Sequence, residues 1–233
     1  MKIGLVCLPF AGAGASFFHP WAALTAQAGD RLVVVPVQLP GRERRIDAEP
    51  YRDAVVAADE LLPDVVRQLD GLTDVVLFGH SLGAVLAYEL AHRVLAHPDL
   101  VLRHLFVSGS PEPHTQRPRR ATGLGDDEFL ARVSEFAGFS HAALEDSEMR
   151  ELILPTLRAD VEMHENYRPS TNDRLPAPLT SLRGSHDSLV TAAEGARWSE
   201  VAGAGFEYVE LPGGHMYLTE SAPELLKLID VAV

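Results

Sequence analysis

The residues from Thr73 to His92 are TDVVLFGHSLGAVLAYELAH, and they carry the clearest signal for the fold. Val75–Phe78 is a short apolar run typical of a buried strand, and the apolar residues after it recur at helical spacing. Between the two lies the pattern G-x-S-x-G, with Ser81 at its centre. At a sharp strand-to-helix turn this pattern predicts a serine nucleophile in a strained backbone conformation. Glycines flank it because side chains there would collide with the neighbouring strand and helix.

The rest of the chain alternates predicted strands and helices, with one interruption. Further strands are predicted at 2–8, 31–37, 101–108, 179–183 and 206–211, and helices at 18–28, 53–69, 191–202 and 223–229. This alternation predicts an α/β fold in one domain, residues 1–233, with a mostly parallel sheet and helices on both faces. At about 123–170 two helices, 126–139 and 147–167, follow each other without a strand. Such an insertion is typical of a lid over an active site, or alternatively of a subdomain with only a packing role.

The composition and the absence of certain motifs argue against several classes of function. The net charge of −13 argues against nucleic acid as a general partner. No apolar run approaches the ~18 residues that span a bilayer, and no signal-peptide cleavage region follows the N-terminus, so we expect a cytoplasmic protein without membrane contact. Cys7 is the only cysteine and no H-E-x-x-H occurs, so we expect no disulfide and no metal. A monomer is the default expectation, although no pattern determines the oligomeric state.

The glycine-rich loop at 9–16 resembles a nucleotide-binding loop only superficially. The pattern G-x-G-x-x-G would need a glycine at position 17, where Phe17 stands, and no G-K-[ST] follows. We therefore expect no nucleotide cofactor. The loop follows the first strand, and it is predicted to supply a backbone N–H to an oxyanion hole.

A serine hydroxyl needs a base to remove its proton, and the base needs an acid to orient it. Among ten histidines, His215 follows the last predicted strand in a Gly-Gly loop, at the sheet edge where Ser81 emerges. Asp187 occupies the equivalent loop one strand earlier, although a turn-capping role remains open for it. The rival acids are Asp160, Glu165, Asp173 and Asp230. The chain order Ser81, Asp187, His215 is that of α/β-hydrolases.

Five motifs together resemble one family over nearly the whole chain. They are Leu8-Pro9-Phe10-Ala11-Gly12, Leu39-Pro40-Gly41-Arg42, Gly79-His80-Ser81-Leu82-Gly83, Gly184-Ser185-His186-Asp187 and Leu211-Pro212-Gly213-Gly214-His215. The combination resembles the type II thioesterases, the free-standing editing enzymes of polyketide synthases and non-ribosomal peptide synthetases. One small departure is Ala13, where many members carry glycine.

The resemblance implies the substrate and the site. Family members hydrolyse acyl groups stalled as thioesters on the phosphopantetheine arms of carrier proteins, without a cofactor. The implied triad is Ser81, Asp187 and His215, and the implied oxyanion-hole amides are those of Ala11 and Leu82. Two alternatives stay open: a generic esterase or acyltransferase on the same fold, and a non-catalytic protein that only binds acyl carriers.

Two sets of residues are predicted to contact the substrate. Apolar side chains of the insertion are expected to face the acyl chain: Phe129, Phe136, Phe139 and Leu157. Acyl carrier proteins are usually acidic, so docking onto a chain of charge −13 requires a local positive surface. The stronger candidate for this surface is Arg117, Arg119 and Arg120, and the weaker one is Arg42, Arg44 and Arg45. Solvated arginines without a specific role are the alternative.

Overall fold

The computed structural model describes residues 2–29, 31–118, 120–137 and 146–233, apart from the side chains of residues 28, 136 and 137. In this part of the chain one six-stranded sheet has the order β2-β1-β3-β4-β5-β6. The strands are β1 (Ile3–Leu8), β2 (Leu32–Pro36), β3 (Asp74–His80), β4 (Val101–Ser108), β5 (Leu179–Gly184) and β6 (Phe206–Leu211). Every neighbouring pair is parallel, so all carboxyl ends meet at one edge.

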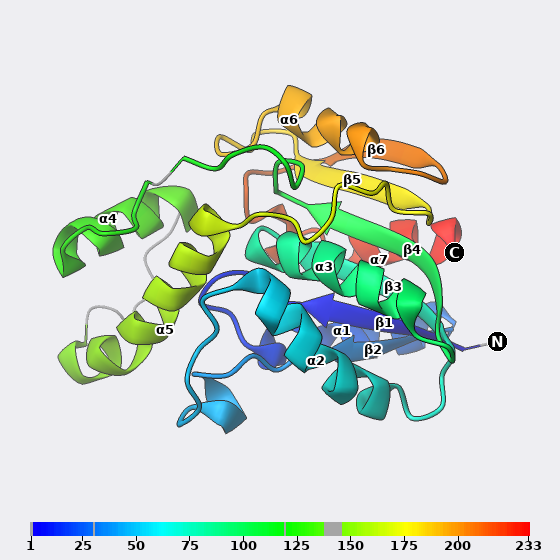
Figure 1. Ribbon diagram of the computed structural model, residues 1–233, viewed down its shortest axis with the longest axis horizontal. Helices are drawn as coiled ribbons and strands as arrows, with labels where there is room; N and C mark the ends of the chain where they lie inside the picture. The colour runs from blue at the N-terminus through cyan, green and yellow to red at the C-terminus, as the bar shows by residue number, and fades with distance from the viewer. Residues whose placement is uncertain (1, 30, 119, 138–145) are drawn as a thin grey trace.

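Helices cover both faces of the sheet, as the alternation predicts. They are α1 (His19–Ala28), α2 (Ala54–Leu69), α3 (Leu82–Ala96), α6 (Ala192–Ala196) and α7 (Ala222–Ala232). Figure 1 shows α2 and α3 on one face, with α1 and α7 on the other. Residues of β3 alternate between two cores: Val75 and Leu77 pack toward α2 and α3, whereas Val76 and Phe78 pack toward α1 and α7.

Two predicted helices differ from the observed ones at their ends. The helix predicted at 18–28 begins at His19, after a 3₁₀ turn (Ala15–Phe18), and Pro20 suits its first turn. The helix predicted at 191–202 ends at Ala196 and tightens into a 3₁₀ turn (Arg197–Glu200). That turn contains the fully buried Trp198, whose indole N–H donates to the carbonyl oxygen of Ser110 at 2.8 Å.

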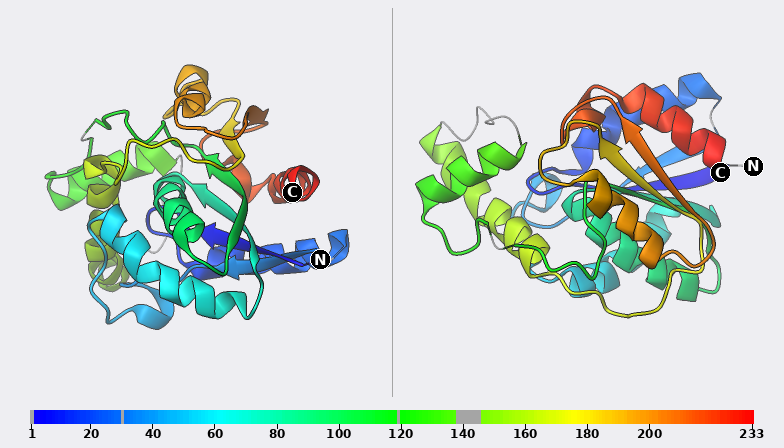
Figure 2. Two further views of the ribbon diagram at one scale, coloured as in Figure 1. Left: turned by 45° about the vertical axis from the view of Figure 1, so that its right-hand side comes forward. Right: turned by 90° about the horizontal axis from the view of Figure 1, so that it is seen from above.

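Helices α4 (Asp126–Ala137) and α5 (Ser147–Asn166) confirm the two predicted helices of the insertion. They lie beyond the carboxyl ends of the strands, on the side of the molecule opposite the termini (Figures 1 and 2). Their apolar residues form a small core of their own, which includes Phe129, Leu154 and Val161. The position beside the sheet edge suits a lid, and the lid role itself stays a prediction. None of the described helices is long and apolar enough to cross a membrane.

Candidate active site

Ser81 occupies a one-residue elbow between β3 and α3. Its φ of 54° and ψ of −115° are strained for a residue other than glycine. A Cβ on Gly79 would lie 1.9 Å from the carbonyl oxygen of Gly83, at the start of α3. A Cβ on Gly83 would lie 2.2 Å from the carbonyl oxygen of Leu8, at the end of β1. The predicted steric reason for both glycines is therefore confirmed.

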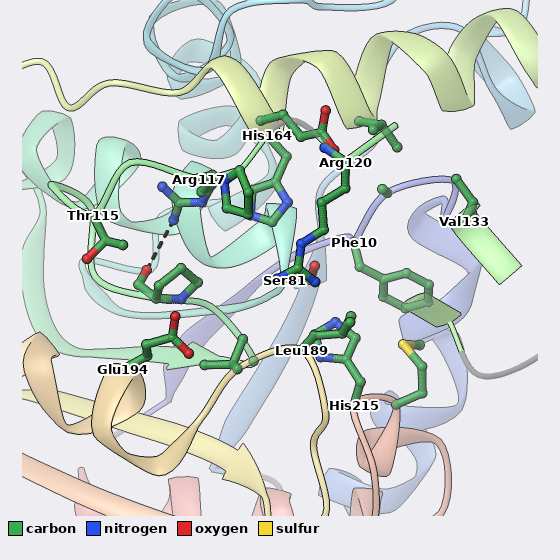
Figure 3. Close-up of a pocket in the computed structure, with 18 of the residues that line it drawn as sticks. Phe10, Ser81, Thr115, Arg117, Arg120, Val133, His164, Leu189, Glu194 and His215 are labelled. Atoms are coloured by element: carbon green, nitrogen blue, oxygen red, sulfur yellow. Dashed lines mark hydrogen bonds between the residues drawn. The ribbon is translucent and has the colours of Figure 1, made fainter. Parts of the chain in front are cut away.

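The elbow places Ser81 at the wall of a cavity of about 200 Å³. The Ser81 N–H donates to the carbonyl oxygen of Ser108 at 2.8 Å, which ties the elbow to β4. Ser81 and His215 both line the cavity, as Figure 3 shows. Its apolar walls come from strand-end loops, from α4 and from α5, and include Phe10, Ala11, Val133, Leu157, Val161, Val190 and Met216.

The predicted acid and base meet at this cavity. His215 Nδ1 and Asp187 Oδ2 are 2.8 Å apart. The second oxygen of Asp187 accepts from the backbone N–H groups of Leu189, at 2.8 Å, and Val190, at 3.1 Å. The loops that carry the pair approach closely, because a Cβ on Gly184 would lie 2.1 Å from the carbonyl oxygen of Gly214.

Asp187 is ionised at neutral pH. Burial raises its pKa, but the hydrogen bond with His215 and the two backbone donors lower it, and the net shift is downward. A carboxylate can only accept, so His215 Nδ1 carries the proton of the pair. This tautomer leaves Nε2 to accept a proton from a nucleophile, which is the arrangement of a general base held by an acid.

The rival acids are engaged elsewhere. Glu165 accepts three backbone N–H groups, those of residues 120–122, at 2.8 to 3.0 Å. Asp160 pairs with Arg42, and Asp230 lies 3.7 Å from Arg31. Asp173 is exposed in the connector that leads to β5. Of the five candidate acids, Asp187 is the one that the structure places against His215.

The predicted oxyanion-hole residues lie on either side of the elbow. Ala11 lines the cavity from the loop after β1, and Leu82 is the first residue of α3. The N–H groups of a first helical turn lack acceptors within the helix, so the Leu82 N–H is available at this helix end. Both residues therefore occupy the places in the chain from which α/β-hydrolases supply oxyanion-hole N–H groups, and this role stays a prediction here.

A buried ion pair holds the Ala11 loop against α5. Arg42 donates to both oxygens of Asp160 at 2.7 Å and to the carbonyl oxygen of Ala13 at 3.0 Å. Asp160 also accepts the backbone N–H of Gly12 at 2.8 Å. Arg42 is 7% exposed, so its predicted membership in a weaker docking surface is wrong. Sequence reasoning missed the pair because its members are far apart in the chain.

His80, the residue before the nucleophile, lies against the predicted base: its ring centroid is 4.8 Å from that of His215. Its Nδ1 pairs with Ser108 Oγ at 2.9 Å, and Ser108 Oγ pairs with the Tyr217 hydroxyl at 2.7 Å. Burial, and then the charge of His215, lower the pKa of His80 far below its ordinary value. A neutral His80 therefore supports the back of the His215 ring.

Comparison with known proteins agrees with this geometry. Residues 4–232 match the thioesterase domain family. The chain belongs to the thioesterase family. Thioesterase PikA5 of Streptomyces venezuelae is 32% identical, over 96% of this chain and 78% of its own. The structure of the type II thioesterase BorB, from the borrelidin biosynthetic cluster, has a TM-score of 0.87 and 35% identity, covering 100% of this chain and 93% of its own. RedJ is a thioesterase from the prodiginine biosynthetic pathway in Streptomyces coelicolor. Its structure has a TM-score of 0.89 and 32% identity, covering 99% of this chain and 90% of its own.

These similarities confirm the family resemblance and the α/β-hydrolase fold that the motifs predict. The chain is a thioesterase, and its relatives act in biosynthetic pathways. The roles of individual side chains rest on the geometry of this structure alone.

The residues that were predicted to contact the acyl chain lie in different places in the structure. Leu157 lines the cavity that contains Ser81. Phe129 is not among the residues that line this cavity. It is 1% exposed within the small core of α4 and α5, and the Arg158 guanidinium lies 4.3 Å from its ring centroid. Its expected contact with the acyl chain is wrong, because helical spacing does not tell an inner face from a cavity wall. The Phe136 side chain and all of Phe139 lie outside the described residues.

The three arginines that were predicted to form the docking surface also differ in their surroundings. Arg117 is 5% exposed and lines the cavity, so it does not contribute to an outer surface. Arg120 is exposed at the cavity, into which Figure 3 shows its side chain extending. Arg119 lies outside the described residues. Of the three, Arg120 is the described arginine whose place still suits a docking role.

Across residues 2–29, 31–118, 120–137 and 146–233, no group of three or more His, Cys, Asp or Glu side chains could hold a metal ion. Cys7 is buried within β1, as its apolar neighbours predict.

Proposed function

We propose that this thioesterase hydrolyses acyl groups from the phosphopantetheine arms of carrier proteins in polyketide or non-ribosomal peptide assembly, with Ser81, His215 and Asp187 as its catalytic triad. Small acyl thioesters would serve as surrogate substrates. The observation that carries the proposal is the 2.8 Å contact between His215 and Asp187 at the cavity that Ser81 also lines. The pathway names of the relatives support the choice of substrate.

In the acylation step Ser81 Oγ attacks the thioester carbonyl carbon while His215 Nε2 takes the hydroxyl proton. The carbonyl oxygen becomes an oxyanion, which the N–H groups of Ala11 and Leu82 stabilise. The carbon–sulfur bond then breaks, and the phosphopantetheine thiol leaves with the proton from His215. A thiolate is a better leaving group than an alkoxide or an amine, so acylation should need little protonation of the leaving group.

In the deacylation step His215 accepts a proton from water as the water attacks the acyl-Ser81 ester. The same two N–H groups stabilise the second oxyanion. Collapse releases the carboxylic acid and returns the proton to Ser81 Oγ. Because acylation has the better leaving group, deacylation is expected to limit the rate. The reaction as written needs no cofactor, and every side chain assigned to it comes from one chain, which suits a monomer.

Access for a carrier protein is proposed at the Arg120 side of the cavity. The chain carries a net charge of −13, and an acidic carrier would be repelled by it at long range. Arg120 is exposed and lines the cavity, so it would provide positive charge beside the path of the phosphopantetheine arm.

Intact-mass measurement of acyl-loaded carrier proteins would test the proposal. Incubation with the enzyme should return carriers to the mass of the free phosphopantetheine form, and a fluorophosphonate probe should label Ser81. The Ser81→Ala variant is the control for both measurements. Faster turnover of p-nitrophenyl esters than of acyl carriers would instead indicate a generic esterase. Intact acyl carriers together with an unlabelled Ser81 would favour the non-catalytic carrier-binding protein.

A further inference from the structure

The wall of the cavity contains a buried cation whose hydrogen-bonding capacity is partly unused. Arg117 Nη2 donates to Ser110 Oγ at 3.0 Å and to the carbonyl oxygen of Pro111 at 3.1 Å. Within the described part of the chain, Arg117 Nε and Nη1 are buried without an acceptor, and no carboxylate forms an ion pair with this guanidinium. Its flat face lies 5.2 Å from the centroid of the Tyr167 ring. Buried polar groups normally have partners, so two unpaired donors at a binding cavity need an explanation.

His164 lies beside Arg117 on the same wall. The side chain projects from α5 toward the cavity, and its buried Nε2 also lacks a partner among the described residues. Burial, and then the charges of Arg117 and His215, lower the pKa of His164 far below its ordinary value. His164 is therefore neutral. Figure 3 shows Arg117 and His164 next to each other at the cavity that Ser81 and His215 line.

The carboxylates of the cavity wall are already occupied. Glu165 accepts three backbone N–H groups, as described above. Glu194 accepts the backbone N–H and the hydroxyl of Thr191, both at 2.8 Å, within a capping box. Burial lowers the pKa of Arg117 to about 10, so its guanidinium is still charged at neutral pH. The wall of the cavity that Ser81 lines therefore contains spare donors, while its two lining carboxylates have their partners.

We infer that the cavity is built for acyl groups that carry a hydrogen-bond-accepting oxygen beyond the thioester carbonyl, a 3-oxo group or a carboxylate, held by Arg117 with His164 beside it. The inference rests on the proposed function, since it names the class of acyl group that the site hydrolyses. An oxygen of this kind satisfies the unpaired guanidinium N–H groups, which a plain alkanoyl chain leaves without a partner.

The size of the cavity suits short members of this class. A cavity of 150 Å³ holds benzene, so about 200 Å³ accommodates an acyl group of roughly six to eight heavy atoms. The apolar side chains of Leu157 and Val161 contact the carbon chain, while Arg117 supplies the polar contact. Selectivity for the polarity of the acyl group is therefore assigned to Arg117, and selectivity for its length to Leu157 and Val161. The two can be tested separately.

N-acetylcysteamine thioesters of butanoic, 3-oxobutanoic and malonic acid test the inference without a carrier protein. For the wild-type enzyme, kcat/KM is measured for each and divided by the rate of hydroxide-catalysed hydrolysis of the same compound. This removes the intrinsic activation of the carbonyl by the second oxygen. For at least one of the two oxygen-bearing thioesters, this normalised kcat/KM should then exceed the value for the butanoyl thioester by on the order of 10- to 100-fold. The 3-oxo and malonyl arms identify whether the preferred oxygen is neutral or anionic.

The Arg117→Gln variant should lower that preference by a similar factor, because the amide cannot replace the charged donor. Arg168→Gln is the matched control: Arg168 is exposed, its side chain donates to the Tyr167 carbonyl oxygen at 2.8 Å, and it does not line the cavity. The preference should be unchanged in Arg168→Gln. Fluorophosphonate labelling of Ser81 confirms that each variant is folded around an intact nucleophile.

Two results would overturn the inference. The first is a wild-type enzyme whose normalised kcat/KM for the butanoyl thioester equals its values for both oxygen-bearing thioesters. This measurement needs no variant, so it still decides the question if Arg117→Gln fails to fold. The other is an Arg117→Gln variant that retains the wild-type preference. An enzyme that hydrolyses none of the thioesters, on N-acetylcysteamine or on a carrier, would instead refute the proposed function.

Discussion

The strand-end loops and the helical insertion meet at one cavity, but they are held in place in different ways. The loops that carry Ser81 and His215 are positioned by backbone packed on backbone, since Gly79, Gly83 and Gly184 leave no room even for a methyl group. The insertion is positioned by side chains. We therefore expect the sheet edge to set the chemistry and the insertion to set the length of the acyl chain that fits.

Within the insertion, α5 and α4 are attached to different degrees. The second half of α5 is tied to the rest of the domain by Asp160 and Glu165, and the Tyr167 hydroxyl that follows the helix donates to the buried Glu89 at 2.7 Å. Helix α4 contacts α5 through their small shared core and through exposed ion pairs, such as Arg158 with Asp126 at 2.5 Å. Exposed pairs contribute little to stability, so we expect α4 to be the more adaptable helix.

The largest expected effect belongs to the sheet edge. Ser81→Ala removes the nucleophile, and His215→Ala leaves the Ser81 hydroxyl without a base. By analogy with other triads, either change should lower kcat on an acyl thioester by on the order of 10⁴-fold or more. Fluorophosphonate labelling should be lost in both variants, while the thermal unfolding midpoint should stay near that of the wild type. Residual activity within tenfold of the wild type would contradict the proposed triad.

Asp187→Asn tests the third position of the same edge. An amide cannot stabilise a charged His215 and favours the wrong imidazole tautomer, so kcat should fall by on the order of 10⁴-fold. Both oxygens of Asp187 accept hydrogen bonds in the native state, so a crystal structure of the variant should be obtained to verify that the loop is unchanged. An active Asp187→Asn together with an inactive Asp160→Asn would move the role of the acid to the insertion.

Asp160→Ala tests the link between the two regions. Removal of this carboxylate leaves Arg42 buried without a counter-ion, which should cost about 3–5 kcal/mol of unfolding free energy. It also releases the Gly12 N–H beside the oxyanion loop, so kcat should fall by on the order of 10- to 100-fold.

A double variant separates these two effects of Asp160. Arg42→Met with Asp160→Leu removes both buried charges and should recover much of the stability in a denaturation experiment. It should not recover kcat, because the Gly12 N–H still lacks its acceptor. If the double variant regained the wild-type kcat, the ion pair would support folding alone and not the geometry of the oxyanion loop.

Leu157 tests the insertion as the wall that sets acyl length. Leu157→Ala enlarges the cavity, and Leu157→Phe fills it, so the preferred chain should lengthen in the first and shorten in the second. Discrimination per methylene is modest, so the ratio of kcat/KM for hexanoyl over propanoyl thioesters should change by about tenfold. Leu152→Ala is the control on the same helix, since Leu152 is 51% exposed. An unchanged ratio in both Leu157 variants would leave α5 a packing role only.

Arg120 should show the smallest effect. Arg120→Glu should raise KM for an acyl-carrier substrate several-fold and weaken its salt dependence, while an N-acetylcysteamine thioester is affected much less. Arg67→Glu is the control, because the Arg67 side chain is 71% exposed near the end of α2, which leads toward the amino end of β3 and away from the cavity. Equal losses on both substrates would mean that Arg120 acts within the cavity and that the carrier docks elsewhere.

The sequence alone determined the sheet and the elements that bear the catalytic residues. Apolar periodicity located each strand to within two residues at either end, since a buried strand and an amphipathic helix impose different local periods. Parallel strands bring their carboxyl ends to one edge whatever the details of packing. This is why Ser81, Asp187 and His215 can be grouped from the order of the elements along the chain, and why Asp187 is found against His215.

The tertiary structure alone decided what local pattern does not encode. Arg42 and Arg117 each belong to a basic cluster that is typical of a solvated surface, yet both are buried, one paired with Asp160 and the other facing the cavity without a carboxylate partner among the described residues. Phe129 packs inside the insertion, whereas Leu157 lines the cavity. These outcomes depend on side chains far apart in the chain, so their contacts exist only once the insertion has packed against the sheet edge.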